Sequence, residues 1–426
     1  MKKKALSLLL VLVMATCLFA GGATETATSD ETPITIWAWD PNFNISIMQE
    51  AISRYQATHP DAKFQIVEIA KADLEQKLHT TLAAKTKTGL PDIVLIEDYN
   101  AQKYLTSYPG QFADLTKSFD YSKFIKSKTD IGVVGGKNYS VPFDSGVTGF
   151  FYRTDLLSKA GYSAADLTNI TWSRFCEIAA DYHKKTGRYL FANGKSDGGL
   201  MRVMLQSAGQ WYFDKDGKPN LVNNAAIREA VQLYKRFIDE DLAYPTNGWN
   251  DWVGALYTSD AASISSGVWI VGSIKAGKDQ SGLWAVAPIP RLSGTSSVNA
   301  SNLGGSSWYI LQNGPKRAAA IAFMNEIYGA DKEFYQTILL NNGAIGSYTP
   351  AFEGDAFAKK DAFFGNYPIY ADLSKWAEMI PMVNIGQYTY EADAAIMANM
   401  EAYYAGKATL DQTLQAAEAQ LKNSIQ

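Results

Sequence analysis

The strongest constraint on the fold comes from residues 34–97, where strand-like and helix-like segments alternate. Residues 34–39 (ITIWAW) and 63–69 (KFQIVEI) have the pattern of strands, and residues 91–97 (PDIVLIE) form a continuous apolar run that is typical of a strand buried on both faces. The segments between them carry apolar residues at helical spacing. Strands that alternate with helices in this way predict an α/β fold with a parallel sheet and right-handed crossovers.

The pattern changes after residue 135, where a turn leads into residues 140–153 (SVPFDSGVTGFFYR). This long extended segment is expected to pass from one domain to another. A second α/β region follows, with helices predicted over 173–185 and 224–240, and a strand is predicted near residues 306–311 (SSWYIL). The chain is too long for one hydrophobic core, and these breaks therefore favour two domains.

Two helix starts carry the signature of a capping box, in which two side chains satisfy the first amides of the helix. Asp73 with Gln76 predicts one start, and Thr409 with Gln412 predicts another near the end of the chain.

The first residues have the organisation of an export signal. Residues 1–4 are basic, residues 5–19 are apolar and small residues follow, so residues 1–23 are predicted to be a signal peptide. Cys17, in MATC, is a possible site of lipidation, whereas plain cleavage at a small residue is the alternative, and both routes stay open. The protein is expected in the periplasm, or anchored to the outer face of the cytoplasmic membrane if Cys17 is lipidated.

The net charge indicates which partners are disfavoured, and the cysteine count indicates whether a disulfide can form. The formal net charge is −4, and it becomes −7 without the three lysines of the leader. That balance disfavours nucleic acid and anionic membranes as partners. The chain has only two cysteines, Cys17 and Cys176, so no disulfide is expected within the mature protein.

Signatures of catalysis and of cofactor binding are weak. Residues 272–279 (GSIKAGKD) approach a P-loop pattern, but Asp279 stands where Ser or Thr would bind magnesium. None of the three histidines, His59, His79 and His183, has a second His or Cys at ligand spacing. We therefore expect no catalytic residue, no cofactor and no metal.

Aromatic rings beside carboxylates are the remaining chemical signal. Trp39 and Asp40 follow the first predicted strand, and Glu97 follows the third. Ligands of open α/β sheets bind beyond the carboxyl ends of the strands, so these residues are expected at one cleft. Flat rings suit the C–H faces of a sugar, and carboxylates accept hydrogen bonds from its hydroxyls. We expect Trp37 to cap the core and Trp39 to face the ligand.

Several longer stretches together resemble a known family. They are ITIWAWDPNFN, GLPDIVLIEDYNAQKYL with FADLT, GKNYSVPFDSGVTGFFYRTDLLSKAG followed by TWSRF, ALYTSDAASISSGVWIVGSI, and LGGSSWYILQNGPKRAAAIAFMNEI. In their order and spacing they resemble the extracellular solute-binding proteins of family 1, the sugar-binding components of ABC importers, to which maltose-binding protein belongs. The resemblance covers nearly the whole mature chain.

The resemblance implies the two-lobed type II periplasmic binding protein fold, an α/β fold with a ligand cleft between lobes that are joined by hinge segments. The N-terminal lobe would comprise residues 32–141 and 301–344, and the C-terminal lobe residues 142–300 and 345–426. By position, the implied sugar-binding residues are Trp39, Asp40, Glu97, Asp98, Tyr99, Asp144, Trp211, Trp269, Gly304, Gly305, Tyr348 and Tyr388. Trp249 and Trp252 are a possible second aromatic platform. The identity of the sugar does not follow.

The function implied by the resemblance is binding without chemistry. The protein, expected to be a monomer, would capture a sugar or oligosaccharide and deliver it to permease subunits in the membrane. Two alternatives stay open. The same fold could bind a non-sugar solute, since tryptophan-rich pockets also accept cations. An exported glycoside hydrolase would need a pair of carboxylates, for which Glu97 and Asp144 are the residues to consider.

Overall fold

The computed structural model describes residues 32–85, 89–294 and 296–425. The predicted signal peptide, residues 1–23, and Cys17 lie outside these ranges. The described residues from Ile34 onward form one compact unit. Among its described helices, none combines the length and the apolar character needed to cross a bilayer.

A five-stranded sheet organises the first part of the fold. Its strand order is β2 (Phe64–Glu68), β1 (Ile34–Ala38), β3 (Ile93–Glu97), β12 (Ser306–Ile310) and β6 (Ser140–Pro142). Strands β1, β2 and β3 are parallel, as the alternating pattern predicted. Strand β12, whose direction was not predicted, is antiparallel to both of its neighbours, so the sheet is mixed. β12 enters the sheet from a distant part of the chain, and it is therefore not bound by the crossover rule that makes consecutive βαβ strands parallel.

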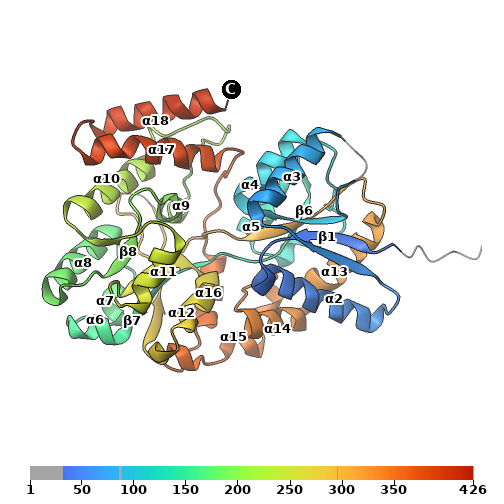
Figure 1. The fold of residues 1–426 in the computed structure, drawn as a ribbon, viewed down its shortest axis with the longest axis horizontal. Helices are drawn as coiled ribbons and strands as arrows, with labels where there is room; N and C mark the ends of the chain where they lie inside the picture. Colours follow the sequence, from blue (N-terminus) through green and yellow to red (C-terminus); the bar gives the residue numbers. More distant parts are fainter. Residues whose placement is uncertain (1–31, 86–88, 295, 426) are drawn as a thin grey trace, which may run out of the picture. The chain divides into compact units, whose positions relative to one another are not determined.

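Helices cover both faces of this sheet (Figure 1). Helices α3 (Lys71–Ala83) and α4 (Asp98–Ser107) pack on the face that carries Trp37 and Val94. Helices α2 (Ser46–Thr58) and α13 (Arg317–Tyr328) pack on the opposite face. Burial on both sides explains why β3 is apolar from Ile93 to Ile96 instead of alternating.

The second part of the fold contains smaller sheets. One has the order β10 (Ser263–Gly267), β7 (Thr148–Arg153), β11 (Trp284–Ala287), and both neighbours are antiparallel to β7. A parallel pair joins β8 (Phe191–Asn193) to β9 (Ala243–Pro245), and a hairpin joins β4 (Val133–Val134) to β5 (Lys137–Asn138). The helices predicted over 173–185 and 224–240 are confirmed as α8 (Trp172–Thr186) and α10 (Ala225–Asp239).

The remaining helices surround these sheets (Figure 1). They are α5 (Lys126–Ile131), α6 (Thr154–Lys159), α7 (Ala164–Leu167), α9 (Gly198–Ser207), α11 (Trp249–Tyr257), α12 (Val271–Ala276), α14 (Lys332–Asn342), α15 (Asp355–Ala358), α16 (Ile369–Glu378), α17 (Thr389–Tyr404) and α18 (Leu410–Ser424).

The two predicted capping boxes had different outcomes. At the start of α18, the Gln412 amide donates to Thr409 Oγ1 at 3.2 Å, and Gln412 Oε1 accepts from the Thr409 amide at 2.9 Å, so this box is confirmed. The box at Asp73 was wrong, because α3 begins two residues earlier, after Ala70, and has no side-chain cap.

The segment over residues 140–153 joins the two larger sheets, as its extended pattern predicted. Its first residues form β6 and its last form β7. Two further passages of the chain run beside it, shown by the backbone bridges Val147–Asn302 and Asp144–Gly346. These three passages lie at the lobe boundaries that the family resemblance implies, and the division itself stays a prediction.

Candidate functional site

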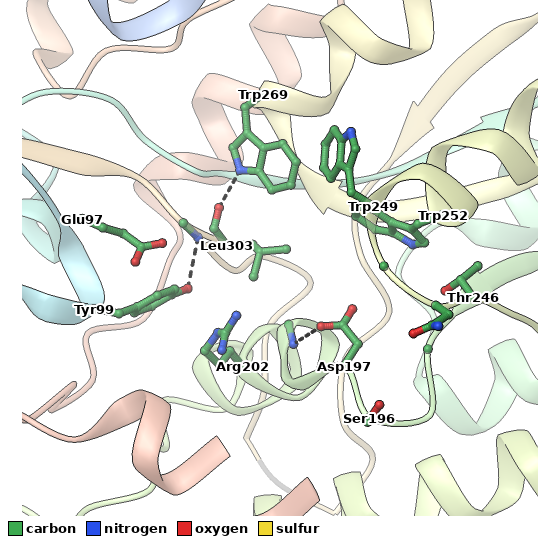
Figure 2. Close-up of a pocket in the computed structure, with 15 residues that line it drawn as sticks. Glu97, Tyr99, Ser196, Asp197, Arg202, Thr246, Trp249, Trp252, Trp269 and Leu303 are labelled. Atoms are coloured by element: carbon green, nitrogen blue, oxygen red, sulfur yellow. Dashed lines mark hydrogen bonds between the residues drawn. The ribbon is translucent and has the colours of Figure 1, made fainter. Parts of the chain in front are cut away.

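A cavity of about 440 Å³ opens where residues from both parts of the fold meet. Tryptophans lie along one side of it, and Tyr99, Arg202 and Asp197 lie on the other (Figure 2). Its full lining is Glu97, Tyr99, Gly194, Ser196, Asp197, Gly199, Arg202, Thr246, Asn247, Gly248, Trp249, Trp252, Trp269, Leu303 and Gly304. We call this space the first cavity.

Three tryptophans form the aromatic wall. Trp249 and Trp252 lie in the first turn of α11, and Trp269 follows β10. The ring centroid of Trp249 lies 5.8 Å from those of both Trp252 and Trp269. The Nε1 groups of Trp252 and Trp269 donate to the backbone carbonyls of Ala192 and Leu303 at 3.2 and 2.8 Å. Their indole N–H groups are thus satisfied, and both rings remain part of the cavity wall.

Arg202 is the main cation of the opposite wall. It extends from α9, and its guanidinium lies 5.0 Å from the ring centroid of Tyr99 and 5.4 Å from that of Tyr390. It forms an ion pair with Asp393 of α17, and the same carboxylate accepts a hydrogen bond from the Tyr212 hydroxyl. Burial raises the pKa of Asp393 to about 6, although Arg202 opposes this shift.

Glu97 lies at the end of β3, at the carboxyl edge of the sheet. Its carboxylate accepts a hydrogen bond from Lys71 Nζ at 2.6 Å and another from the Tyr390 hydroxyl. Lys71 comes from α3 and Tyr390 from α17, so the carboxylate is fixed from two sides. A charged oxygen fixed in this way is a suitable acceptor for a ligand hydroxyl.

Gly304 and Gly305 form a turn that no other residue type fits well. Their φ angles are +75° and +95°, a region that favours glycine. The Gly304 amide donates to the Tyr99 hydroxyl at 3.2 Å. A Cβ on Gly305 would lie 3.0 Å from Asp98 Oδ2 and 3.2 Å from Lys128 Nζ. Because glycine has no side chain, the backbone at these two positions lines the cavities directly.

A second cavity, of about 350 Å³, adjoins the first. It is lined by Trp39, Asp40, Phe43, Asn44, Lys71, Glu97, Asp144, Trp249, Trp269, Ser273, Gly304, Gly305 and Ser306. Asp144 accepts a hydrogen bond from the Ser306 amide at 2.7 Å. Burial raises the pKa of Asp144 to about 6; Lys128 opposes this effect and Asp98 adds to it.

The structure brings eight of the twelve sequence-predicted site residues to these cavities. The first cavity contains Glu97, Tyr99, Trp269 and Gly304, and the second contains Trp39, Asp40, Asp144 and Gly305 together with Glu97, Trp269 and Gly304. Trp37 is buried against α3, with Lys77 Nζ 4.2 Å from its ring centroid, whereas Trp39 is only partly buried. Trp37 thus lies in the core and Trp39 lines the second cavity, while the contact of Trp39 with a ligand stays a prediction.

The other four predicted residues line neither cavity. Asp98 is fully buried, and its carboxylate pairs with Lys128 and accepts from Ser307. Trp211 is also buried; its ring stacks on Tyr99, and its Nε1 donates to Thr389. Both side chains have protein partners and support residues of the site, and their direct contact with a ligand stays a prediction.

The two remaining tyrosines also lie away from the cavities. Tyr348 is buried and stacks on Tyr335 with ring centroids 5.5 Å apart. Tyr388 immediately precedes α17 and packs against the core around that helix. Tyr390, two residues farther along, lines neither cavity either, but its hydroxyl donates to Glu97, which lines both. Tyr348 and Tyr388 thus pack against the protein in this structure, and their contact with a ligand stays a prediction.

Sequence reasoning missed Arg202, Asp197, Lys71 and Tyr390. One signal was available for Arg202, because it is the only charged residue within α9, whose other residues are mostly apolar (GGLMRVMLQS). A cation in a buried helix must find a partner or a ligand. Trp249 and Trp252, which were predicted only as a possible second platform, belong to the main aromatic wall.

The arrangement has the chemistry of a binding site. Flat rings, fixed charges and backbone groups converge on a space large enough for a small ligand. Within residues 32–85, 89–294 and 296–425, no group of three His, Cys, Asp or Glu side chains is placed to hold a metal ion.

The fold and the cavities define the class as a two-lobed binding protein of the periplasmic type II fold. A solved structure of an extracellular solute-binding protein of family 1 shares this fold with a TM-score of 0.78 and 18% identity, covering 93% of this chain and 100% of that one. Residues 50–365 match the family model described as bacterial extracellular solute-binding protein, and the chain belongs to this family.

Two relatives have established names. A lactose-binding protein from Rhizobium radiobacter is 49% identical over 393 residues, which are 92% of this chain and 93% of that protein. An arabinooligosaccharide-binding protein from Bacillus subtilis (strain 168) is 25% identical over 299 residues, which are 68% of each chain.

Proposed function

We propose that this protein is the sugar-binding component of an ABC importer, which captures a sugar or oligosaccharide and delivers it to permease subunits in the membrane. The observation that carries the proposal is the first cavity, where three tryptophans face charged and polar groups across about 440 Å³. Such a wall suits the apolar face of a pyranose, and the opposite side suits its hydroxyls. The protein would act outside the cytoplasm, with lipid attachment at Cys17 as an open alternative.

A disaccharide of the lactose type is the first ligand to consider. The relative that is 49% identical over most of both chains is named for lactose binding. The first cavity falls in the size range of small-molecule sites. In this proposal Glu97 accepts hydrogen bonds from sugar hydroxyls and Arg202 donates to sugar oxygens, while Trp249, Trp252 and Trp269 stack on the rings.

We propose binding without catalysis. Hydrolysis of a glycoside needs two carboxyl groups that flank one bond, one of them free to transfer a proton. Glu97 and Asp144 both line the second cavity, but Glu97 is held by Lys71 and Tyr390, and Asp144 is occupied by the Ser306 amide. The family is one of solute-binding proteins, which agrees with this reading.

The test is a titration of the protein lacking residues 1–23 with lactose and a panel of mono- and oligosaccharides. Tryptophan fluorescence would report binding, because the aromatic wall lies in the site, and calorimetry would give stoichiometry and affinity. We expect saturable binding of lactose or of an oligosaccharide in the panel, which is recovered chemically unchanged. Release of monosaccharides would support a hydrolase. If no sugar binds, but a cationic solute binds and is not displaced by sugars, the ligand belongs to another class.

A further inference from the structure

The two cavities are neighbours that share part of their walls. Four residues line both of them: Glu97, Trp249, Trp269 and Gly304. The shared residues come from the edge of the large sheet, from the start of α11 and from the segment after β10. The two spaces, of about 440 and 350 Å³, therefore meet along a common boundary of aromatic rings and one carboxylate.

Trp249 is the most exposed ring at this boundary. It retains 50% of its accessible surface, although it lies beside two other tryptophans. It is the first residue of α11 and follows Gly248, whose φ of +89° turns the chain into the helix. Figure 2 shows its indole beside Trp269, on the side of the first cavity opposite Tyr99 and Arg202. A large apolar surface left open at a boundary of two cavities can contact a ligand in either one.

The second cavity has the same kinds of groups as the first, supplied by different residues. Trp39, immediately after β1, provides a further partly exposed ring, and it packs against both main cores. Asp40, Lys71 and Asp144 add charged oxygen and nitrogen atoms. Ser273 of α12 adds a small polar side chain to the lining. Rings beside hydrogen-bonding groups are thus present on both sides of the shared boundary.

From this continuity we propose that the two cavities are two compartments of one sugar site, and that the protein binds an oligosaccharide of at least three units. The inference rests on the proposed sugar-binding function and specifies the length of its ligand. Two units occupy the first cavity, and the chain continues past Trp249 and Trp269 into the second, where Trp39 stacks on a further ring. Glu97 accepts hydrogen bonds from the units on either side of the boundary.

The test compares lactose with two trisaccharides that extend it by one hexose, one at the non-reducing end and one at the reducing end. Affinities are measured by calorimetry on the protein lacking residues 1–23. We expect one trisaccharide to bind about tenfold more tightly than lactose, which corresponds to about 1.4 kcal/mol. If both trisaccharides bind no better than lactose, the second cavity is not a sugar compartment and the inference is overturned.

A pair of variants tests which cavity provides the higher affinity for the trisaccharide. Trp39→Ala removes a ring that lines only the second cavity, and Trp252→Ala removes one that lines only the first. We expect Trp39→Ala to lower the affinity for the favoured trisaccharide about tenfold more than the affinity for lactose, so that the ratio of the two affinities falls to about one. Trp252→Ala should weaken all three sugars together. An equal loss of lactose and trisaccharide affinity in Trp39→Ala would contradict two separate compartments.

A second variant guards against misfolding of Trp39→Ala. Ser273→Phe places a ring in the second cavity from a partly exposed position on a helix, without contact to the first cavity. It should reduce trisaccharide affinity to that of lactose, and retained trisaccharide preference in this variant would overturn the inference. If the wild type binds no sugar at all, the proposed function fails before the question of length arises, so the two failures are distinguishable.

Discussion

Trp269 is oriented by one hydrogen bond, from its Nε1 to the carbonyl of Leu303 at 2.8 Å. The bond joins the segment after β10 to the turn that contains Gly304, and a Cβ on Gly267 would lie 2.3 Å from the same Nε1. The ring is thus fixed before a ligand arrives, and binding therefore loses less conformational entropy. This one ring lines both cavities.

We expect Trp269→Ala to weaken sugar binding by about 1–3 kcal/mol, because it removes one stacked ring and the contact that fixes Leu303. The matched control is Trp376→Ala, since Trp376 is partly buried on α16 and lines neither cavity. Calorimetric titrations of both variants measure the difference. Wild-type affinity in Trp269→Ala would remove this residue from the site.

Asp144 should make the stability of the protein depend on pH. Burial raises the pKa of its carboxyl from 3.8 to about 6, so the folded protein holds this proton more tightly than the unfolded chain. The contribution of Asp144 to the free energy of unfolding therefore falls as pH rises from about 4 to about 6 and stays constant above that. Relative to Asp144→Asn, the wild type should lose about 2–3 kcal/mol over this window, measured by urea unfolding at several pH values.

Asp114 provides a control of opposite sign. Hydrogen bonds from Thr116 and from Lys137 lower the pKa of its carboxyl to about 2. Its stabilising contribution is present above pH 4 and is lost as pH falls toward 2. Asp114→Asn should therefore change the pH dependence only in the acid range. A flat difference between wild type and Asp144→Asn from pH 4 to 6 would contradict the environment described for Asp144.

Among the secondary-structure elements, the last helix shows how a local signal fixes a boundary. The Thr409–Gln412 capping box at the start of α18 satisfies the first amides of the helix, whose Leu414 and Leu421 are buried against the core. We expect Thr409→Ala to lower the free energy of unfolding by about 1 kcal/mol, whereas Thr409→Ser, which keeps the oxygen, should be nearly neutral. Urea unfolding of the two variants tests this, and equal stability would show that packing alone holds the helix.

The sequence predicted those elements whose signals are local. β1, β2, β3, α8 and α10 were all indicated by periodicity, and α18 by its cap. The direction of β12 was not, because pairing between Trp308 and Leu95 joins residues more than two hundred positions apart. The start of α3 was missed because Asp73 is a good cap by type, but the helix had already begun after Ala70.

Residues of the candidate site that directly follow a strand could be predicted from the sequence, whereas those on helices were harder to place. Trp39 and Glu97 could be placed because the carboxyl ends of parallel strands meet at one edge. Arg202 could not be oriented, because its partners Tyr99 and Asp393 come from α4 and α17. Trp211 and Tyr348 line neither cavity, because a sequence does not distinguish a ring that supports a site from one that lines it.

At the scale of the whole molecule, the two parts of the fold are joined by passages of backbone that lie against each other. The Leu303 amide donates to the Gly146 carbonyl at 2.8 Å, and the Ser145 amide donates to the Ile345 carbonyl at 2.8 Å. The same stretch continues into Gly304 at the cavity floor. The contacts between these backbone segments therefore fix both the connection between the two sheets and the position of Gly304 in the site.

Gly146 is a tight point of this junction, where backbone meets backbone. A Cβ on Gly146 would lie 2.1 Å from the Leu303 carbonyl oxygen and 2.7 Å from its carbon. Because both atoms belong to the backbone, the crossing segments themselves must separate. We expect Gly146→Ala to lower the free energy of unfolding by about 2–3 kcal/mol and to weaken sugar binding, since the displaced segment carries Leu303 and Gly304 of the first cavity.

The control for this change is Gly254→Ala. Gly254 lies within α11, and a Cβ there meets no atom within 4 Å. Alanine in a helix has less conformational entropy to lose than glycine, so this variant should be as stable as the wild type or more stable by about 0.5–1 kcal/mol. Urea unfolding and lactose titration of both variants measure the two effects. If Gly146→Ala matched Gly254→Ala in stability and affinity, the crossings would be free to shift, and the close approach at Leu303 would not fix the cavity.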